Sequence, residues 1–260
     1  MRSPLPQARR PVFWQGWGHF LRQLLYFALA YLAYRIVRGL VADDGTLAFQ
    51  HAREVIAFER SLHLFVEPTL QHAVSSVPTV MTILGWLYIN AQFTITVAAM
   101  LFLYFYRPAA YQPARDTLLL AMGLALIGYA LYPTAPPRFL PEWGFVDSVS
   151  DVTGLHLSQS SALFSDFFNP YAAIPSMHVA FALCIALPMA RSCRHRLAAL
   201  LWLCYPALIA FVVVVTGNHF LLDVTLGILT TVLARSLAGL GERLRHALGE
   251  PLPATGQASG

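Results

Sequence analysis

The chain has 260 residues, of which 57% are hydrophobic and only 12% are charged, and its mean hydropathy is +0.57. Soluble domains are about 25% charged, so this composition excludes an ordinary soluble protein. The net charge is +4, the basic residues are all arginine, and we expect no nucleic-acid partner. The three cysteines show no spacing typical of a metal site or a disulfide framework.

Six apolar runs in the sequence are long enough to cross a bilayer, which takes about 20 residues of helix. The first run is preceded by a stretch that lacks the basic tip and apolar core of a cleavable signal peptide, so we expect a retained helix. The fourth run is short, and we expect its N-terminal end to lie below the membrane surface. The runs cover 20–41, 79–106, 115–134, 174–190, 197–215 and 219–238. The sequence therefore predicts an all-α, polytopic membrane protein with six transmembrane helices.

The arginines alternate with acidic residues along these six runs. Basic side chains lie before the first run, between the second and third, between the fourth and fifth, and after the sixth, whereas the other connections are rich in Asp and Glu. Because basic residues collect in cytoplasmic loops, both termini are predicted to be cytoplasmic. The starts of the fourth and sixth runs are then predicted to face the extracytoplasmic side of the cell membrane.

Two of the predicted outer connections are long. Residues 46–77 carry apolar side chains at helical spacing, which predicts one or two amphipathic helices at the membrane interface. The apolar positions are Leu47, Val55, Phe58, Leu62 and Phe65. Residues 133–171 are rich in Pro, Ser and aromatics and are expected to cover the functional site. We predict a single domain, 1–249, followed by a disordered tail, 250–260.

Two short segments place histidines where apolar runs begin: Pro175-Ser176-Met177-His178, and Gly217-Asn218-His219-Phe220-Leu221-Leu222-Asp223. Ionisable residues at membrane depth are expensive and indicate a functional site. His219 and Asp223 are four residues apart, so they share one helix face. The carboxylate can then hold the imidazole in one tautomer, as a nucleophilic or acid–base histidine requires.

Arg138 follows the third run directly, which places it on the same membrane face as the two histidines. Its planar guanidinium is suited to a phosphate, although an arginine here could also pair with Glu142 on the surface. Ser176 is either an ordinary helix N-cap or a hydroxyl that contacts a bound anion beside helix N-terminal amides. Two imidazoles, a carboxylate and a guanidinium together favour phosphoryl transfer without a metal or other cofactor.

We expect His219 to attack phosphorus and become a phosphohistidine, with Asp223 on its other ring nitrogen. His178 would protonate the leaving alcohol and then deprotonate the acceptor. Arg138 and backbone amides would hold the charge that develops on the equatorial oxygens.

At these residues the sequence resembles the type 2 phosphatidic acid phosphatase (PAP2) superfamily. The family pattern has a Lys-x6-Arg-Pro block, a Pro-Ser-x-His block and a Ser-Arg-x5-His-x3-Asp block. Pro175 to His178 matches the second block, His219 with Asp223 matches the end of the third, and Arg138 stands for the arginine of the first. The resemblance implies a six-helix fold and a lipid phosphatase or phosphotransferase.

The sequence departs from this pattern in its cations. Leu131 stands at the lysine position, proline precedes Arg138 instead of following it, and the Ser-Arg pair falls on Val212 and Val213. This reduced set is similar to the branch that contains inositol phosphorylceramide synthases, as are segments 59–67 and 216–219. The resemblance assigns Asn218, with Arg138 and Ser176, to phosphate binding. Fewer cations favour a diester or headgroup transfer over a phosphate monoester.

Three other interpretations remain open from the sequence. His178 and His219 could ligate a haem in an electron-transfer protein. Ser176 with His219 could form an intramembrane serine protease, although no Gly-x-Ser-x-Gly elbow surrounds Ser176. The chain could also be a catalytically inactive membrane scaffold. Water and an alcohol are both possible acceptors, and the sequence leaves the oligomeric state undetermined.

Overall fold

The computed structural model describes residues 16–40, 45–148 and 171–248, and within these ranges the chain is helical without β-strands. The main helices are α1 (Gly16–Leu40), α2 (Gly45–Ser61), α3 (Glu67–Ser75), α4 (Pro78–Asn90), α5 (Thr96–Tyr106), α6 (Pro108–Leu131), α9 (Met177–Ser192), α10 (Arg196–Val215) and α11 (Leu221–Ala247). A π-helical turn, η1 (Ala91–Ile95), joins α4 to α5, and two short 3-10 turns, η2 (Pro137–Phe139) and η3 (Pro141–Trp143), follow α6. The all-α prediction is confirmed, and the predicted tail lies outside the described residues.

Four of the six predicted spans are confirmed as segments long and apolar enough to cross a membrane. They are Pro78–Tyr106, Pro108–Leu131, Arg196–Val215 and Leu221–Ala247. The other two predicted spans are also helical, as α1 and α9, but they are not among these four. α9 has 16 residues, which is about 24 Å at 1.5 Å per residue and shorter than the roughly 30 Å hydrocarbon core. The chain is therefore a membrane protein, and six complete crossings stay a prediction.

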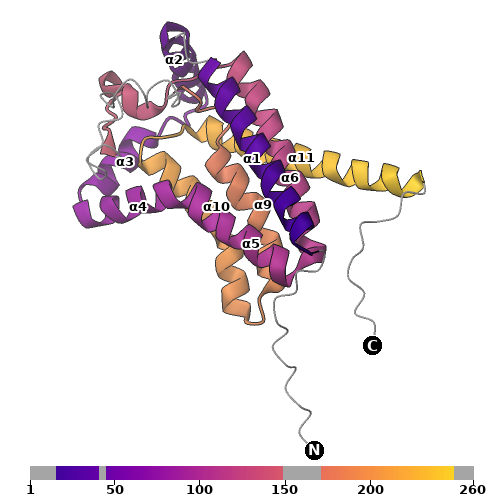
Figure 1. Ribbon diagram of the computed structural model, residues 1–260. Helices are drawn as coiled ribbons and strands as arrows, with labels where there is room; N and C mark the ends of the chain where they lie inside the picture. Colours follow the sequence, from indigo (N-terminus) through magenta and orange to yellow (C-terminus); the bar gives the residue numbers. More distant parts are fainter. Residues whose placement is uncertain (1–15, 41–44, 149–170, 249–260) are drawn as a thin grey trace, which may run out of the picture.

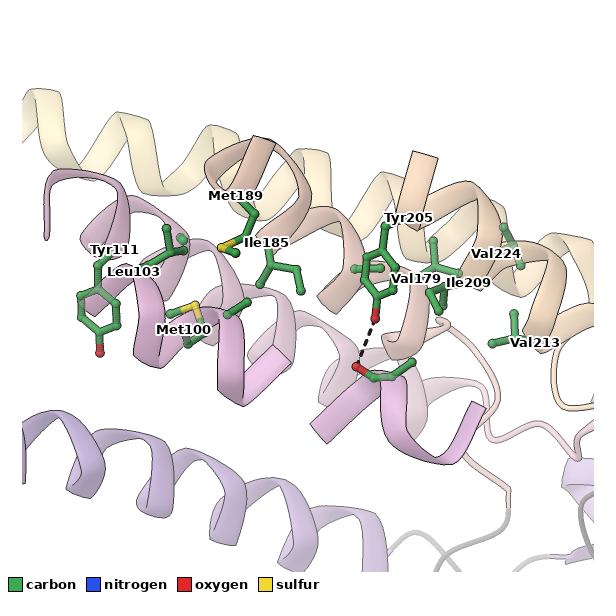
Figure 2. Packing of buried hydrophobic residues seen from close by; sticks show 14 of the residues in the cluster. Met100, Leu103, Tyr111, Val179, Ile185, Met189, Tyr205, Ile209, Val213 and Val224 are labelled. Carbon is green, nitrogen blue, oxygen red and sulfur yellow. Dashed lines mark hydrogen bonds between the residues drawn. The ribbon is translucent and has the colours of Figure 1, made fainter. Parts of the chain in front are cut away.

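α9 lies in the middle of the helices and packs against α5, α6, α10 and α11 (Figure 1). Most of its buried residues are small or aliphatic, among them Val179, Ala182 and Ile185, which allows close approach of the neighbouring helices. Figure 2 shows the cluster in which these residues meet Met100 and Ile209. The Tyr205 hydroxyl donates to the Ala91 carbonyl oxygen at 3.3 Å, which ties α10 to the π-helical turn. The central position of α9 fixes the end of the helix that carries His178.

α2 and α3 lie together at the end of the molecule where α9 and α11 begin (Figure 1). The predicted helical content of 46–77 is confirmed by α2 and α3, and their position at the membrane interface stays a prediction. Phe58 and Leu62 are about half exposed, at 49% and 50%. The buried face of α2 carries Ala48, Ala52, Val55, Ile56 and Glu59. Small side chains let the loop after α6 come close, as shown by the hydrogen bond from Ala135 N–H to the Ala48 carbonyl oxygen at 3.0 Å.

Candidate active site

The turn between α10 and α11 carries His219. The valines that end α10, Val212 to Val215, are at most 3% exposed, and they anchor the turn in the core. Gly217 reverses the chain with φ +68°, a conformation that L side chains rarely adopt. The N–H groups of Asn218 and His219 both donate to the Val213 carbonyl oxygen, at 3.0 and 3.1 Å. The backbone around His219 is therefore fixed on both sides.

His219 and Asp223 are in direct contact at the start of α11. The Nδ1 atom of His219 lies 3.2 Å from Oδ2 of Asp223, and the same oxygen accepts the Phe220 N–H at 3.0 Å. An ionised Asp223 can only accept hydrogen bonds, so the carboxylate favours the tautomer with the proton on Nδ1. Asp223 is completely buried and His219 is 5% exposed. The buried carboxyl group therefore orients the imidazole.

The Pro175–His178 segment is inserted between α6 and α11. The Tyr129 hydroxyl donates to the Pro175 carbonyl oxygen at 3.1 Å, and Ser176 N–H donates to the Asp223 carbonyl oxygen at 3.0 Å. The insertion needs glycines on both sides. A Cβ atom on Gly128 would lie 2.7 Å from Pro175 Cδ, and one on Gly227 would lie 2.5 Å from the Ser176 carbonyl oxygen. These close approaches determine where α9 begins.

His178, the second residue of α9, lies between two rings. Its imidazole stacks on Tyr88 of α4 with centroids 4.4 Å apart, and it meets His219 edge to face at 5.7 Å. The two histidines predicted from the sequence are therefore neighbours. Tyr88 had no place in the sequence prediction, because an aromatic residue inside an apolar run carries no signal of its own.

Arg138 lies in η2 beside the same turn. Its backbone N–H donates to the Gly217 carbonyl oxygen at 2.7 Å, and its guanidinium carbon is 4.9 Å from the Phe139 ring centroid. Its Nε atom lies 3.7 Å from Oδ1 of Asp147. The ion-pair partner is thus Asp147, whereas a surface pairing would have used Glu142. The arginine is 7% exposed, which is unusual for a charged side chain.

Buried polar atoms without a hydrogen-bond partner gather at these residues. Within the described residues they include Ser176 Oγ, Asn218 Oδ1, Arg138 Nε and Asp223 Oδ1. Ser176 is the N-cap residue of α9, yet its side chain makes no capping hydrogen bond. Asn218 is held by its Nδ2, which donates to the hydroxyl and carbonyl oxygens of Thr216 at 2.8 and 3.2 Å. Such unsatisfied groups call for an explanation, and a bound polar ligand would supply one.

Apolar residues occupy the positions at which the family pattern has a lysine and a Ser-Arg pair. Val212 and Val213, at the positions of the Ser-Arg pair, are completely buried in apolar clusters. Leu131, at the lysine position, is 76% exposed at the end of α6. In the described parts of the chain, no three His, Cys, Asp or Glu side chains are grouped so as to hold a metal ion.

Two carboxyl groups near the site were not singled out from the sequence as site residues. Glu59 of α2 accepts the Leu222 N–H at 2.8 Å, and Glu67 of α3 accepts the Leu221 N–H at 3.0 Å. A signal was present in the sequence, because Glu59 continues the stripe formed by Ala48, Ala52 and Val55 at helical spacing.

A comparison with known protein families gives one match, whereas no curated protein and no solved structure matches the chain. The model of the PAP2 superfamily matches residues 53–237. The matched region is most of the chain, and it contains Arg138, Ser176, His178, and the turn from Asn218 to Asp223. On this match, the chain belongs to the PAP2 superfamily.

Proposed function

We propose that this protein is a membrane lipid phosphatase or phosphotransferase that works through a phosphohistidine on His219. Membership of the PAP2 superfamily suggests a phosphatase-type activity on lipid phosphates. The observation that carries the proposal is the hydrogen bond between His219 Nδ1 and Asp223 Oδ2 at 3.2 Å. With the proton on Nδ1, Nε2 is the proposed nucleophilic nitrogen, and the buried carboxylate would stabilise the positive charge that the ring acquires when Nε2 bonds to phosphorus.

His178 is the proposed acid and base. In the first step Nε2 of His219 attacks phosphorus, the bond from phosphorus to the lipid's leaving oxygen breaks, and protonated His178 gives that oxygen a proton. In the second step His178 removes a proton from the acceptor hydroxyl, which attacks phosphorus and breaks the bond to His219. The edge-to-face contact of the two rings at 5.7 Å supports this proposal, because an acid and a nucleophile that act on one phosphoryl group must lie close together.

Arg138, Ser176 and Asn218 are the proposed phosphate-binding residues. The guanidinium and the Ser176 hydroxyl are donors, and both have buried atoms without a partner in the described residues. The Asn218 side chain is oriented by Thr216 and leaves a buried carbonyl oxygen for a hydroxyl of the substrate. Positive charge fixed before the reaction stabilises the transition state without reorganisation, so the proposed chemistry requires no metal or cofactor.

An apolar cavity of about 280 Å³ supports a lipid substrate. Its lining includes Phe27, Gln92, Phe93, Met100 and Phe181. Gln92 comes four residues after Tyr88 and Phe181 three residues after His178, so the cavity begins about one helical turn below the two rings. A hydrocarbon chain in this cavity would place the attached phosphate near the histidines.

The reduced set of cations favours transfer of a phosphorylated headgroup, as the likeness to the inositol phosphorylceramide synthase branch suggests. A phosphodiester carries one negative charge, which a single buried arginine can match. The arginine distribution further suggests that the reaction takes place on the extracytoplasmic side of the cell membrane, where the energy must come from the donor lipid itself.

The alternatives account for fewer of these contacts. Two haem ligands lie on opposite faces of a porphyrin, whereas the His178 and His219 rings contact each other edge to face. A serine protease needs a hydrogen bond from its nucleophile to a base, and Ser176 Oγ has no partner in the described residues. An inactive scaffold would not require a buried His–Asp pair.

The test is to purify the protein and incubate it with a panel of radiolabelled lipid phosphates, with and without inositol or another alcohol. We expect a phosphoryl adduct that is stable to base and labile to acid, and no adduct on His219→Gln. Released phosphate would identify a hydrolase, and a new lipid headgroup in the mass spectrum a transferase. Full turnover by His219→Gln would refute the mechanism.

A further inference from the structure

The N-terminus of α11 is held by three carboxyl groups from three different helices. Glu59 of α2 accepts the Leu222 N–H, Glu67 of α3 accepts the Leu221 N–H, and Asp223 of α11 accepts the Phe220 N–H, at 2.8, 3.0 and 3.0 Å. The first N–H groups of a helix have no partner within the helix, and negative charge is favoured at that end. These bonds therefore fix the backbone between His219 and Asp223.

Glu59 and Glu67 are buried together. They are 2% and 0% exposed, and neither forms an ion pair with a basic side chain of the described residues. Their Oε1 atoms accept adjacent N–H groups of one helix, those of Leu222 and Leu221, so the two carboxyl groups are neighbours. Their Oε2 atoms have no hydrogen-bond partner in that part of the chain. Two buried carboxylates without a cation repel each other, and this repulsion favours one proton on the pair.

Glu59 favours its protonated form at neutral pH. Burial, and then the interaction with Glu67, raise the pKa of Glu59 from 4.5 to about 9, and Asp223 adds to the rise, while the Leu222 N–H opposes it. The titratable groups that act on Glu59 are therefore Glu67 from α3 and Asp223 from α11. Apolar side chains of the same cluster include Val55 and Ile56 of α2 and Phe220 of the α10–α11 turn.

We propose that Glu59 and Glu67 form a proton-sharing pair, one acid and one carboxylate, that positions the His219–Asp223 dyad through the N-terminus of α11. The inference rests on the function proposed for that dyad. With one proton, the pair supplies one negative charge and accepts two backbone N–H groups. Without the proton, Glu59, Glu67 and Asp223 would be three buried anions at one helix end, and their mutual repulsion would displace the turn that carries His219.

The test uses Glu59→Gln, Glu67→Gln, the double glutamine variant and Glu59→Ala, with Glu242→Gln of the exposed part of α11 as the matched control. A single glutamine can donate its amide N–H to the remaining carboxylate while its oxygen still accepts the backbone N–H. The double glutamine variant loses the charge, and alanine loses the cap. We expect kcat to fall by about 10- to 100-fold in the double glutamine variant and in Glu59→Ala, with KM little changed. The two single glutamine variants should keep most of the wild-type kcat.

A second measurement is independent of the reaction. Because the pKa of Glu59 is raised on folding, its contribution to stability is complete below pH about 4.5 and is lost progressively as the pH rises to about 9. The Tm of the wild type and of Glu242→Gln should fall across this range more steeply than that of Glu59→Gln. The ¹⁵N chemical shifts of His219 should show the Nδ1–H tautomer in the single glutamine variants and a mixture in the double variant.

The results separate the two proposals. If the pH dependence of Tm and the His219 tautomer change as expected but no phosphoryl adduct forms, the pair is confirmed and the phosphohistidine function is wrong. Parallel Tm profiles for wild type and Glu59→Gln would overturn the shared proton. Wild-type kcat in the double glutamine variant would overturn the positioning role. If the double variant fails to fold, the single variants still decide through their Tm profiles.

Discussion

The backbone N–H of Ser176 donates to the backbone carbonyl oxygen of Asp223 at 3.0 Å. This bond joins the two segments that carry the histidines, although they are more than forty residues apart in the chain. Residues that act on the same phosphoryl group must keep a constant separation. The direct backbone bond maintains it without depending on either side chain.

Gly227→Ala should damage the site through this junction. The new Cβ would lie 2.5 Å from the Ser176 carbonyl oxygen, which is backbone and cannot rotate away. We expect a stability loss of about 1–3 kcal/mol from overpacking and a fall in kcat as His178 moves away from His219. The measurements are thermal unfolding in detergent and turnover of the lipid phosphate that labels the wild type.

The matched control is Gly239→Ala in the same helix, where a Cβ would meet nothing within 4 Å. Replacing an open helical glycine by alanine should stabilise by about 0.5–1 kcal/mol and leave turnover unchanged. Equal behaviour of the two variants would show that the close approach of α11 to Ser176 has no functional weight.

Asp223→Asn should keep the shape of the turn and lose the tautomer. The same oxygen of Asp223 accepts the Phe220 N–H and faces His219 Nδ1, so an amide oxygen there keeps both contacts but lacks the negative charge that stabilises the imidazolium. In the flipped orientation the amide nitrogen donates to Nδ1, which moves the ring proton to Nε2. A protonated Nε2 cannot attack phosphorus. We expect a loss of about two to four powers of ten in kcat, as for other orienting aspartates. Near-normal turnover would make Asp223 a purely structural cap.

The activity lost in His178→Ala should be restored by a substrate whose leaving group needs no proton. General acids typically contribute about 10²- to 10⁴-fold, so turnover of a lipid ester should fall by that amount. The p-nitrophenolate group of a p-nitrophenyl phosphodiester leaves without protonation. This substrate should therefore label His219 of the variant at nearly the wild-type rate in a single turnover. If the variant loses both substrates equally, His178 binds phosphate and is not the acid.

Activity should persist in EDTA, because the proposed reaction uses Arg138 and backbone N–H groups where other phosphotransferases use Mg²⁺. The measurement is turnover after dialysis against the chelator, with Mg²⁺ restored as the control. A strict Mg²⁺ requirement would show that carboxylates such as Asp147 are ligands that we have not recognised.

The sequence predicted the helices well because their signal is local. Apolar runs determine where α6, α10 and α11 form, and the i,i+4 spacing of His219 and Asp223 already implies their contact. The short length of α9 was also expected from its apolar run, 174–190, although the helix begins only at Met177. Each of these features depends on residues that lie within a few positions of it in the sequence.

The contacts that support the site were not predictable in the same way. Glu59 and Glu67 appeared as two acids in an outer connection, since nothing local indicates that they reach the first N–H groups of α11. Tyr88 and Asp147 were missed for the same reason. Which apolar side chains of α2 would be buried was not predictable either: Phe58 and Leu62 are about half exposed, because in a membrane protein a large apolar side chain does not have to face the protein core.

Sidedness is the remaining prediction, and it follows from charge alone. Arginines flank the connections that we assign to the cytoplasm, including Arg107, Arg115, Arg191, Arg194 and Arg196, whereas the connections at the histidine end carry most of the acids. This asymmetry orients a chain during insertion. We therefore expect His178 and His219 to face the extracytoplasmic side.

Two exposed positions at opposite ends can report it: Ser61 at the end of α2 and His195 between α9 and α10. In a background with Cys184, Cys193 and Cys204 replaced by alanine, Ser61→Cys should react with an impermeant maleimide in intact cells. His195→Cys should react only after the cells are opened, which also controls for its accessibility. The reverse pattern would place the histidines in the cytoplasm and show that the arginines do not determine the orientation of this chain.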